Sequence, residues 1–120
     1  MSHILLVEDN QDMQTLLCEM LVYGDHTVMT GRTGQEALVV LQDAQTLPEL
    51  IISDLNMPHL DGIGLLYAVR QNPQWQHMAF VIMSANVNDE RLTPDVIASL
   101  DGVIPKPFNL DDLNGLLSRV

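Results

Sequence analysis

Residues 50–62 have the sequence LIISDLNMPHLDG, and this stretch constrains how the rest of the chain can fold. A short apolar run ends on the carboxylate of Asp54, and a turn-forming segment with Asn56, Pro58 and Gly62 follows at once. Apolar runs of this length between turn-forming residues predict buried strands. Asp54 is therefore expected at the carboxyl end of a strand, where open α/β sheets place their ligand sites. The alternative role for an aspartate at this position is a helix cap or a turn former.

The same strand-then-turn pattern recurs on both sides of this stretch and alternates with helix-forming segments. We expect strands over residues 4–7, 26–30, 50–54, 79–83 and 103–104. Helices are expected between Asn10 and Gly24, over 36–41, 62–71 and 94–100, and after Asn109. Such alternation implies a mostly parallel sheet with helices on both faces. The predicted fold class is α/β, a doubly wound (βα)5 three-layer sandwich around a parallel five-stranded sheet.

The predicted helices carry recognisable starts and apolar faces. The expected caps are Asp9 or Asn10 for the first helix, Thr33 with Glu36 as a capping box for the second, Thr93 for the fourth and Asn109 for the last. The predicted buried face of the first helix comprises Met13, Leu16, Leu17, Met20 and Leu21.

Composition and charge exclude several classes of protein. The chain has 120 residues, 47% of them hydrophobic, and a formal net charge of −11. Direct binding of DNA or RNA is not expected, because a phosphate backbone would be repelled. Cys18 is the only cysteine, which excludes an internal disulfide and fits a packed structural thiol in a reducing compartment. The N-terminal segment resembles neither a signal peptide nor a membrane span, so we expect a cytoplasmic protein.

Five polar side chains fall at the carboxyl ends of predicted strands: Glu8, Asp9, Asp54, Ser84 and Lys106. In the flavodoxin-like strand order 2-1-3-4-5, the first and third strands are neighbours, so the three carboxylates come together. Like charges at this separation repel one another, and Mg²⁺ is the hard cation that would neutralise them. Lys106, the only lysine, would stand on the other side of Asp54, and Ser84 would offer a hydroxyl. This arrangement suits transfer of a phosphoryl group to Asp54.

These residues resemble the receiver domains of bacterial two-component response regulators. The resemblance covers residues 1–120 as one domain and rests on four motifs: Glu8-Asp9, Asp54 with Met57-Pro58 and Asp61-Gly62, Ser84-Ala85, and Lys106-Pro107-Phe108. Successive separations of 45, 30 and 22 residues between Asp9, Asp54, Ser84 and Lys106 also fit that family.

The resemblance implies a role for each site residue. Asp54 would accept a phosphoryl group from the phosphohistidine of a sensor histidine kinase or phosphotransfer protein. Glu8, Asp9, Asp54 and the backbone carbonyl of Asn56 would hold Mg²⁺. Ser84 would hydrogen-bond the acyl phosphate, Lys106 would pair with it, and the Lys106-Pro107 bond would be cis.

The resemblance also implies partners. An output domain after Val120, or a separate effector protein, would read the phosphorylated state. A weak homodimer would form through the face made by the fourth helix, the fifth strand and the fifth helix. Such a domain catalyses only its own phosphorylation and dephosphorylation.

The sequence departs from the family at Val103, where most receivers carry Tyr or Phe. A valine has no ring whose rotamer could report phosphorylation, so another readout is expected. Asn56 and Asn86 occupy positions that tune the acyl-phosphate lifetime in this family, and His59 is expected to be an exposed turn residue.

Two alternatives remain open from the sequence. One is a pseudo-receiver that binds a partner without phosphorylation, although it would be expected to lack Asp54, Asp9 or Lys106. The other is an aspartyl-phosphate phosphohydrolase. Such an enzyme needs a second carboxylate as general acid, commonly two residues after the nucleophile, where this chain has Asn56.

Overall fold

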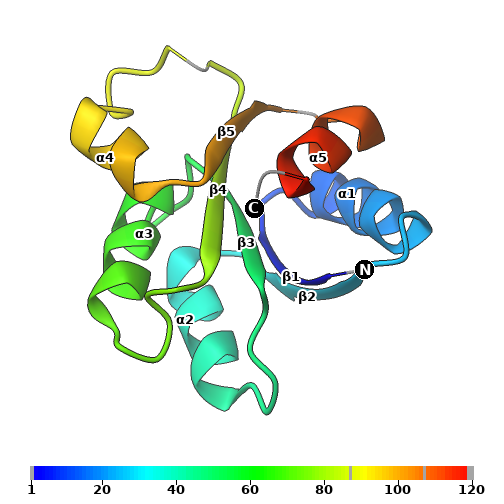
Figure 1. Ribbon diagram of the computed structural model, residues 1–120, viewed down its shortest axis with the longest axis horizontal. Helices are drawn as coiled ribbons and strands as arrows, with labels where there is room; N and C mark the ends of the chain where they lie inside the picture. The colour runs from blue at the N-terminus through cyan, green and yellow to red at the C-terminus, as the bar shows by residue number, and fades with distance from the viewer. Residues whose placement is uncertain (1, 87, 107, 119–120) are drawn as a thin grey trace.

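The structure is a computed structural model that describes residues 2–86, 88–106 and 108–118. Strands and helices alternate five times along the chain (Figure 1). The strands are β1 (His3–Val7), β2 (Thr27–Gly31), β3 (Leu50–Asp54), β4 (Ala79–Ser84) and β5 (Gly102–Pro105). The helices are α1 (Gln11–Tyr23), α2 (Gly34–Asp43), α3 (Gly62–Gln71), α4 (Pro94–Ser99) and α5 (Leu110–Leu117).

The five strands form one parallel sheet in the order β2-β1-β3-β4-β5. This confirms the predicted doubly wound α/β class and its strand order. In the register, Val7 at the end of β1 lies opposite Ser53, and Asp54 at the end of β3 lies opposite Met83. The carboxyl ends of β1, β3 and β4 therefore meet at one edge of the sheet. Pro105, which cannot donate a backbone hydrogen bond, lies in β5 at the outer edge of the sheet.

Helices cover the two faces of the sheet and make two separate cores. On one face, α2, α3 and α4 pack through side chains such as Ala37, Leu65 and Val96 against alternate strand residues. On the other face, α1 and α5 pack through Leu17 and Leu113. Figure 1 shows the two groups of helices on opposite sides of the strands. Because the strands are covered on both faces, their apolar runs are continuous rather than alternating.

Four residues predicted as helix caps act as caps in the structure. A backbone N–H three residues on donates to the side-chain oxygen of each of Asn10, Thr33, Thr93 and Asn109. Asn10 rather than Asp9 caps α1. Of the capping box predicted for α2, only the bond from the Glu36 N–H to Thr33 is found. A reciprocal capping box is found instead in α5, between Asn109 and Asp112.

Two sequence predictions were wrong in detail. Leu16 was assigned to the buried face of α1 but is 49% exposed. It lies about 100° around the helix from the buried Leu17, at the border of the packed stripe. The second strand begins at Thr27 rather than His26, because His26 belongs to the preceding turn. Its ring is buried and accepts a hydrogen bond from the backbone N–H of Ser2.

None of the helices in the described part of the chain is long and apolar enough to cross a membrane.

Candidate functional site

The loop after β3 fixes the backbone behind Asp54. The backbone N–H of Gly62 donates to the carbonyl of Leu55 at 3.0 Å, so the start of α3 is drawn close to the end of β3. A Cβ atom on Gly62 would lie 2.5 Å from the backbone oxygen of Asp54, which only the absence of a side chain avoids. The Ser53 hydroxyl also donates to that oxygen, at 2.9 Å. The position of the Asp54 carboxylate is therefore set by packing on the helix side.

Lys106 joins two carboxylates from neighbouring strands. Its Nζ lies 2.8 Å from Oδ2 of Asp54 and 2.6 Å from Oε1 of Glu8. The backbone N–H of Lys106 donates to the carbonyl of Ser84, which anchors the lysine to the end of β4. The sequence prediction that Glu8, Asp54 and Lys106 converge is confirmed by these distances.

Burial raises the pKa of Glu8 to about 7, because its carboxyl has no exposed surface. The hydrogen bond from Lys106 works against this rise, and the charge of Asp54 adds to it. For Lys106, burial lowers the pKa, but the hydrogen bonds and charges of Asp54 and Glu8 outweigh burial and raise it. Two carboxylates therefore share one ammonium in a site that is almost closed to water.

The acidic cluster fits a hard divalent cation. Glu8, Asp9 and Asp54 each offer a ligand atom, and these atoms lie within 4.8 Å of one another. Oε1 of Glu8 is buried, and the Lys106 ammonium lies 2.6 Å from it. One ammonium does not offset the charges of three neighbouring carboxylates, and a divalent cation would neutralise the remainder. Carboxylate oxygens are ligands that Mg²⁺ takes, usually one or two of them together with waters.

Asn56, the remaining predicted Mg²⁺ ligand, follows the cluster in the loop after β3. Its backbone N–H lies 3.4 Å from Oδ1 of Asp54, so the residue borders the acceptor. The assignment of its backbone carbonyl to the metal stays a prediction.

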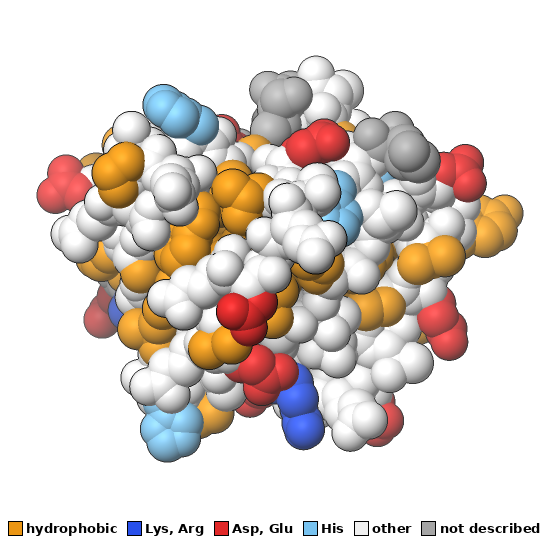
Figure 2. Space-filling model, turned by 90° about the horizontal axis from the view of Figure 1, so that it is seen from below, with side chains coloured by type: hydrophobic (Ala, Val, Ile, Leu, Met, Phe, Trp, Pro, Cys, Tyr) orange, Lys and Arg blue, Asp and Glu red, His pale blue; other side chains and the backbone are white. Residues whose placement is uncertain are grey.

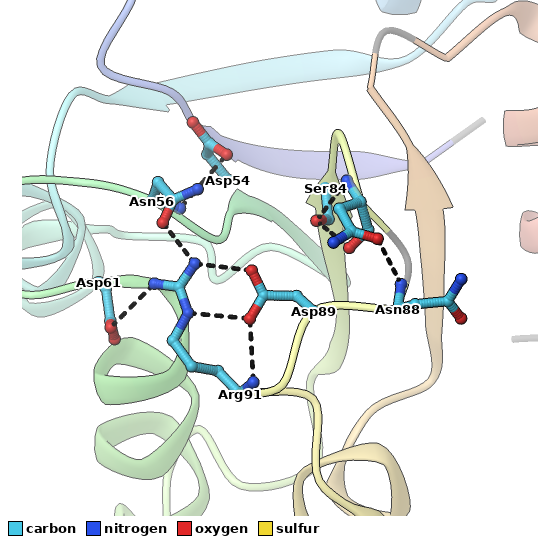
Figure 3. Close-up of polar contacts among 8 residues, drawn as sticks. Asp54, Asn56, Asp61, Ser84, Asn88, Asp89 and Arg91 are labelled. Atoms are coloured by element: carbon cyan, nitrogen blue, oxygen red, sulfur yellow. Dashed lines mark hydrogen bonds and ion pairs between the residues drawn. The ribbon is translucent and has the colours of Figure 1, made fainter.

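Ser84 lies at the end of β4, but its side chain is turned toward its own loop (Figure 3). The hydroxyl donates to the carbonyl of Asn86 at 2.7 Å and accepts from the N–H of Asn86 at 3.1 Å. Among the described residues it makes no hydrogen bond with Asp54. The structure thus brings Glu8, Asp9, Asp54 and Lys106 together but leaves the Ser84 hydroxyl apart from them.

Sequence analysis missed Arg91, which lies in the loop between β4 and α4. Its Nη2 donates to the side-chain oxygen of Asn56 at 2.5 Å and to Oδ2 of Asp89 at 2.9 Å. Figure 3 shows the guanidinium between these two residues and Asp61. The available signal was that Arg91 is one of only five basic residues in the chain and follows the carboxyl end of a strand.

An open cavity of about 310 Å³ lies at this edge of the sheet. It is lined by Asp9, Asn56, Met57, Pro58, Asp61 and Arg91. Asp9 belongs to both the cavity and the acidic cluster, so the cavity borders the cluster at Asp9.

Comparison with known proteins matches this chain to one family. The model of the response regulator receiver domain matches residues 4–118. The chain belongs to this family. It is therefore a receiver domain of two-component signalling systems, as the sequence motifs predicted.

Relatives of this receiver domain include both short and long proteins. It is 29% identical to a probable chemotaxis protein CheY of Rhizobium etli, over 98% of this chain and 90% of the relative. It is 31% identical to the sensor histidine kinase TmoS of Ectopseudomonas mendocina, over 98% of this chain but 12% of the kinase. The crystal structure of Vibrio cholerae CheY4 is 29% identical, covers 100% of this chain and 98% of its own, and superposes with a TM-score of 0.87.

Two further sequence predictions concern residues near the site. His59 is exposed, as expected, and adopts a positive φ of 69° in the loop after β3. Val103 lies in β5 opposite Ile82 and is partly buried. The predicted cis bond before Pro107 lies outside the described residues.

Proposed function

We propose that this receiver domain accepts a phosphoryl group on the Asp54 carboxylate from a phosphohistidine of a sensor histidine kinase or phosphotransfer protein. The observation that carries the proposal is the pairing of Lys106 Nζ with Asp54 Oδ2 at 2.8 Å beside the buried Glu8. The Lys106 ammonium contacts both Asp54 and Glu8, and these two carboxylates form a metal-compatible cluster with Asp9. Positive charge would therefore gather around the carboxylate that we propose as the nucleophile.

In the transfer, an Asp54 oxygen forms a new bond to phosphorus while the bond from phosphorus to the histidine nitrogen breaks. The nitrogen keeps the electron pair and takes up a proton. Mg²⁺, when bound by Glu8, Asp9 and Asp54 with the backbone carbonyl of Asn56, supplies charge neutralisation for the phosphoryl oxygens. Lys106 pairs with the acyl phosphate and stabilises the negative charge of its phosphoryl oxygens.

Ser84 completes the proposed site only after a rearrangement. Its hydroxyl donates to the Asn86 carbonyl, so it must leave that partner to donate to a phosphoryl oxygen. This exchange of one hydrogen bond for another would pull the loop after β4 toward Asp54. We propose that this movement, rather than an aromatic rotamer at Val103, changes the surface formed by α4, β5 and α5.

The same proposal covers the partners and the setting. The domain, taken as residues 1–120, is cytoplasmic, acts only on its own phosphorylation state, and passes its signal to an output domain or a separate effector. A weak homodimer through α4, β5 and α5 is one form that the readout can take. A chemotaxis protein and a sensor histidine kinase among the relatives support both a free-standing and a fused setting.

The test is to incubate the protein with acetyl phosphate and Mg²⁺ and to measure the intact mass. We expect one added phosphoryl group, which requires Mg²⁺ and disappears in Asp54→Asn. In Lys106→Met we expect the rate of phosphoryl gain to fall at least tenfold, because the positive charge beside the acceptor is lost.

Two results would contradict the proposal. One is the absence of any mass gain in the wild-type protein, and the other is an equal gain in Asp54→Asn. Steady release of phosphate from unrelated monoesters would point instead to a phosphohydrolase.

A further inference from the structure

Arg91 is held in place before any ligand arrives. Its Nε donates to Oδ1 of Asp89 at 3.1 Å, and its Nη2 donates to Oδ2 of the same carboxylate at 2.9 Å. This two-pronged pairing fixes the plane of the guanidinium. Arg91 therefore has little side-chain freedom left to lose when an anion binds.

The Arg91 guanidinium, in the loop after β4, lines the open cavity of about 310 Å³. Nη2 also reaches across to the Asn56 side chain, which comes from the loop after β3 (Figure 3). Nη1 lies 4.0 Å from Oδ2 of Asp61 and, among the described residues, donates no hydrogen bond. With 41% of the side chain exposed and Arg91 lining the cavity, the N–H groups of Nη1 are available to an incoming acceptor.

The cavity that Arg91 lines is otherwise surrounded by negative charge. The lining includes the carboxylates of Asp9 and Asp61, and the chain as a whole carries −11. A phosphodonor is itself an anion, so it meets repulsion on its way to Asp54. Lys106 is already paired with Asp54 and Glu8, and it does not line the cavity. Arg91 is the cationic side chain among the described residues that line the cavity.

We propose that Arg91 binds the phosphoryl oxygens of the donor through Nη1 and so holds the donor in the cavity that Asp9 shares with the acidic cluster. This inference rests on the proposed function, and it assigns Arg91 to donor recognition. The contact is with the phosphoryl group, so it serves a phosphohistidine and a small phosphodonor alike. In the reaction that follows, the Asp54 oxygen bonds to phosphorus and the leaving group departs with its electron pair, while Arg91 keeps all its protons.

The test compares phosphorylation rates of three variants over a range of donor concentrations at saturating Mg²⁺. Arg91→Met removes the guanidinium, and Arg91→Lys keeps the charge without the two-pronged anchor. Arg32→Met is the matched control, because Arg32 is exposed and has no hydrogen bond or ion pair among those of the described residues. Each variant receives acetyl phosphate in one series and phosphoramidate in the other.

For Arg91→Met, we expect the donor concentration for half-maximal rate to rise about fivefold, as loss of one charge-assisted hydrogen bond implies. The maximal rate should change less than twofold, since Arg91 does not contact Asp54. Arg91→Lys should lie between Arg91→Met and wild type, and Arg32→Met should match wild type. Added salt should shrink the difference between wild type and Arg91→Met, because the contact is exposed.

Several outcomes overturn the proposal while leaving phosphorylation of Asp54 intact. Unchanged donor dependence in Arg91→Met would show that Arg91 only ties the two loops together. An equal effect in Arg32→Met would show that the change follows from the net charge of the protein and not from the position of Arg91. An effect with acetyl phosphate but not phosphoramidate would place the contact on the acyl part of the donor. Failure of the proposed function is distinct, because the wild-type protein would then gain no phosphoryl group.

Discussion

At the residue scale, the two cationic side chains near the acceptor, Lys106 and Arg91, lie in different surroundings. Lys106 is partly buried between Asp54 and Glu8 and makes a short contact with each. Arg91 is more exposed and is paired with a carboxylate of its own loop, Asp89. A compact ammonium suits the narrow space beside the acceptor, whereas a planar guanidinium can be anchored and still present donors. The two residues therefore fit different steps, the chemistry for Lys106 and the approach of the donor for Arg91.

The Asp89–Arg91 pair can be tested by titration. Hydrogen bonds from Arg91 hold the pKa of Asp89 at about 2, below its ordinary 3.8. Because the folded-state pKa is depressed, the pair contributes stability that is present above the ordinary value and lost as pH falls through about 2. Carboxyl carbon NMR should find this low midpoint in wild type and a return toward 3.8 in Arg91→Met. An ordinary midpoint in wild type would contradict the pairing.

Residues of the site differ in how far the sequence could predict them. Glu8, Asp54 and Lys106 were predictable because parallel strands all present their carboxyl ends at one edge. The orientation of Ser84 was not, because it depends on which loop carbonyl its hydroxyl meets. Arg91 was missed for a similar reason, since its role follows from a contact with Asn56 across 35 residues of sequence.

At the scale of elements, the chain's capping residues and apolar runs determined most boundaries. The predicted limits of α3 match those found, Gly62–Gln71, because Asp61 caps its start and Pro73 prevents a longer helix. Errors fell where a neighbour decides burial: Leu16 on α1 and the turn at His26. Capping residues and apolar runs do not indicate where a neighbouring element packs.

Arg70 joins the ends of three elements away from the site. From α3 it donates to the backbone carbonyls of Ser99, Gln76 and Met78, at 3.1, 3.0 and 2.6 Å. It also pairs at 3.3 Å with Asp101, whose carboxylate accepts from the N–H of Phe80 at 2.7 Å. One side chain thus satisfies carbonyls at the end of α4 and before β4.

Arg70→Met is expected to lower the free energy of unfolding by about 2 kcal/mol, because several partly buried carbonyls lose their donor. Urea denaturation monitored by far-ultraviolet circular dichroism measures the change. Arg32→Met, which removes the same charge from an exposed position, should stay within about 0.5 kcal/mol of wild type. A comparably small loss in Arg70→Met would mean that water replaces the guanidinium at these carbonyls.

At the scale of the whole molecule, negative charge is the dominant property. The chain holds 16 acidic residues against 5 basic ones. Figure 2 shows the end of the molecule opposite the site, where acidic side chains are spread over the surface and basic ones are sparse. Charge of one sign disfavours the compact state through self-repulsion. At the site the repulsion is local, because Glu8, Asp9 and Asp54 are held within a few ångströms of one another by the fold.

Mg²⁺ should therefore stabilise the folded protein more than screening alone can. At about 100 times its dissociation constant, a single bound ion adds about 2.7 kcal/mol. For a domain of this size that corresponds to a rise of roughly 8–13 °C in the thermal midpoint. Differential scanning calorimetry should find this rise with MgCl₂ and a much smaller one with NaCl at equal ionic strength.

Asp9→Asn is the control that separates the site from general screening. Without Mg²⁺ it should be more stable than wild type, because one of three mutually repelling carboxylates is gone. With Mg²⁺ it should gain little, because a charged ligand is missing from the set. An equal rise with NaCl, or a full response to Mg²⁺ in Asp9→Asn, would show that the ion acts on the charge of the whole surface. The wild-type response would then carry no information about the carboxylates around Asp54.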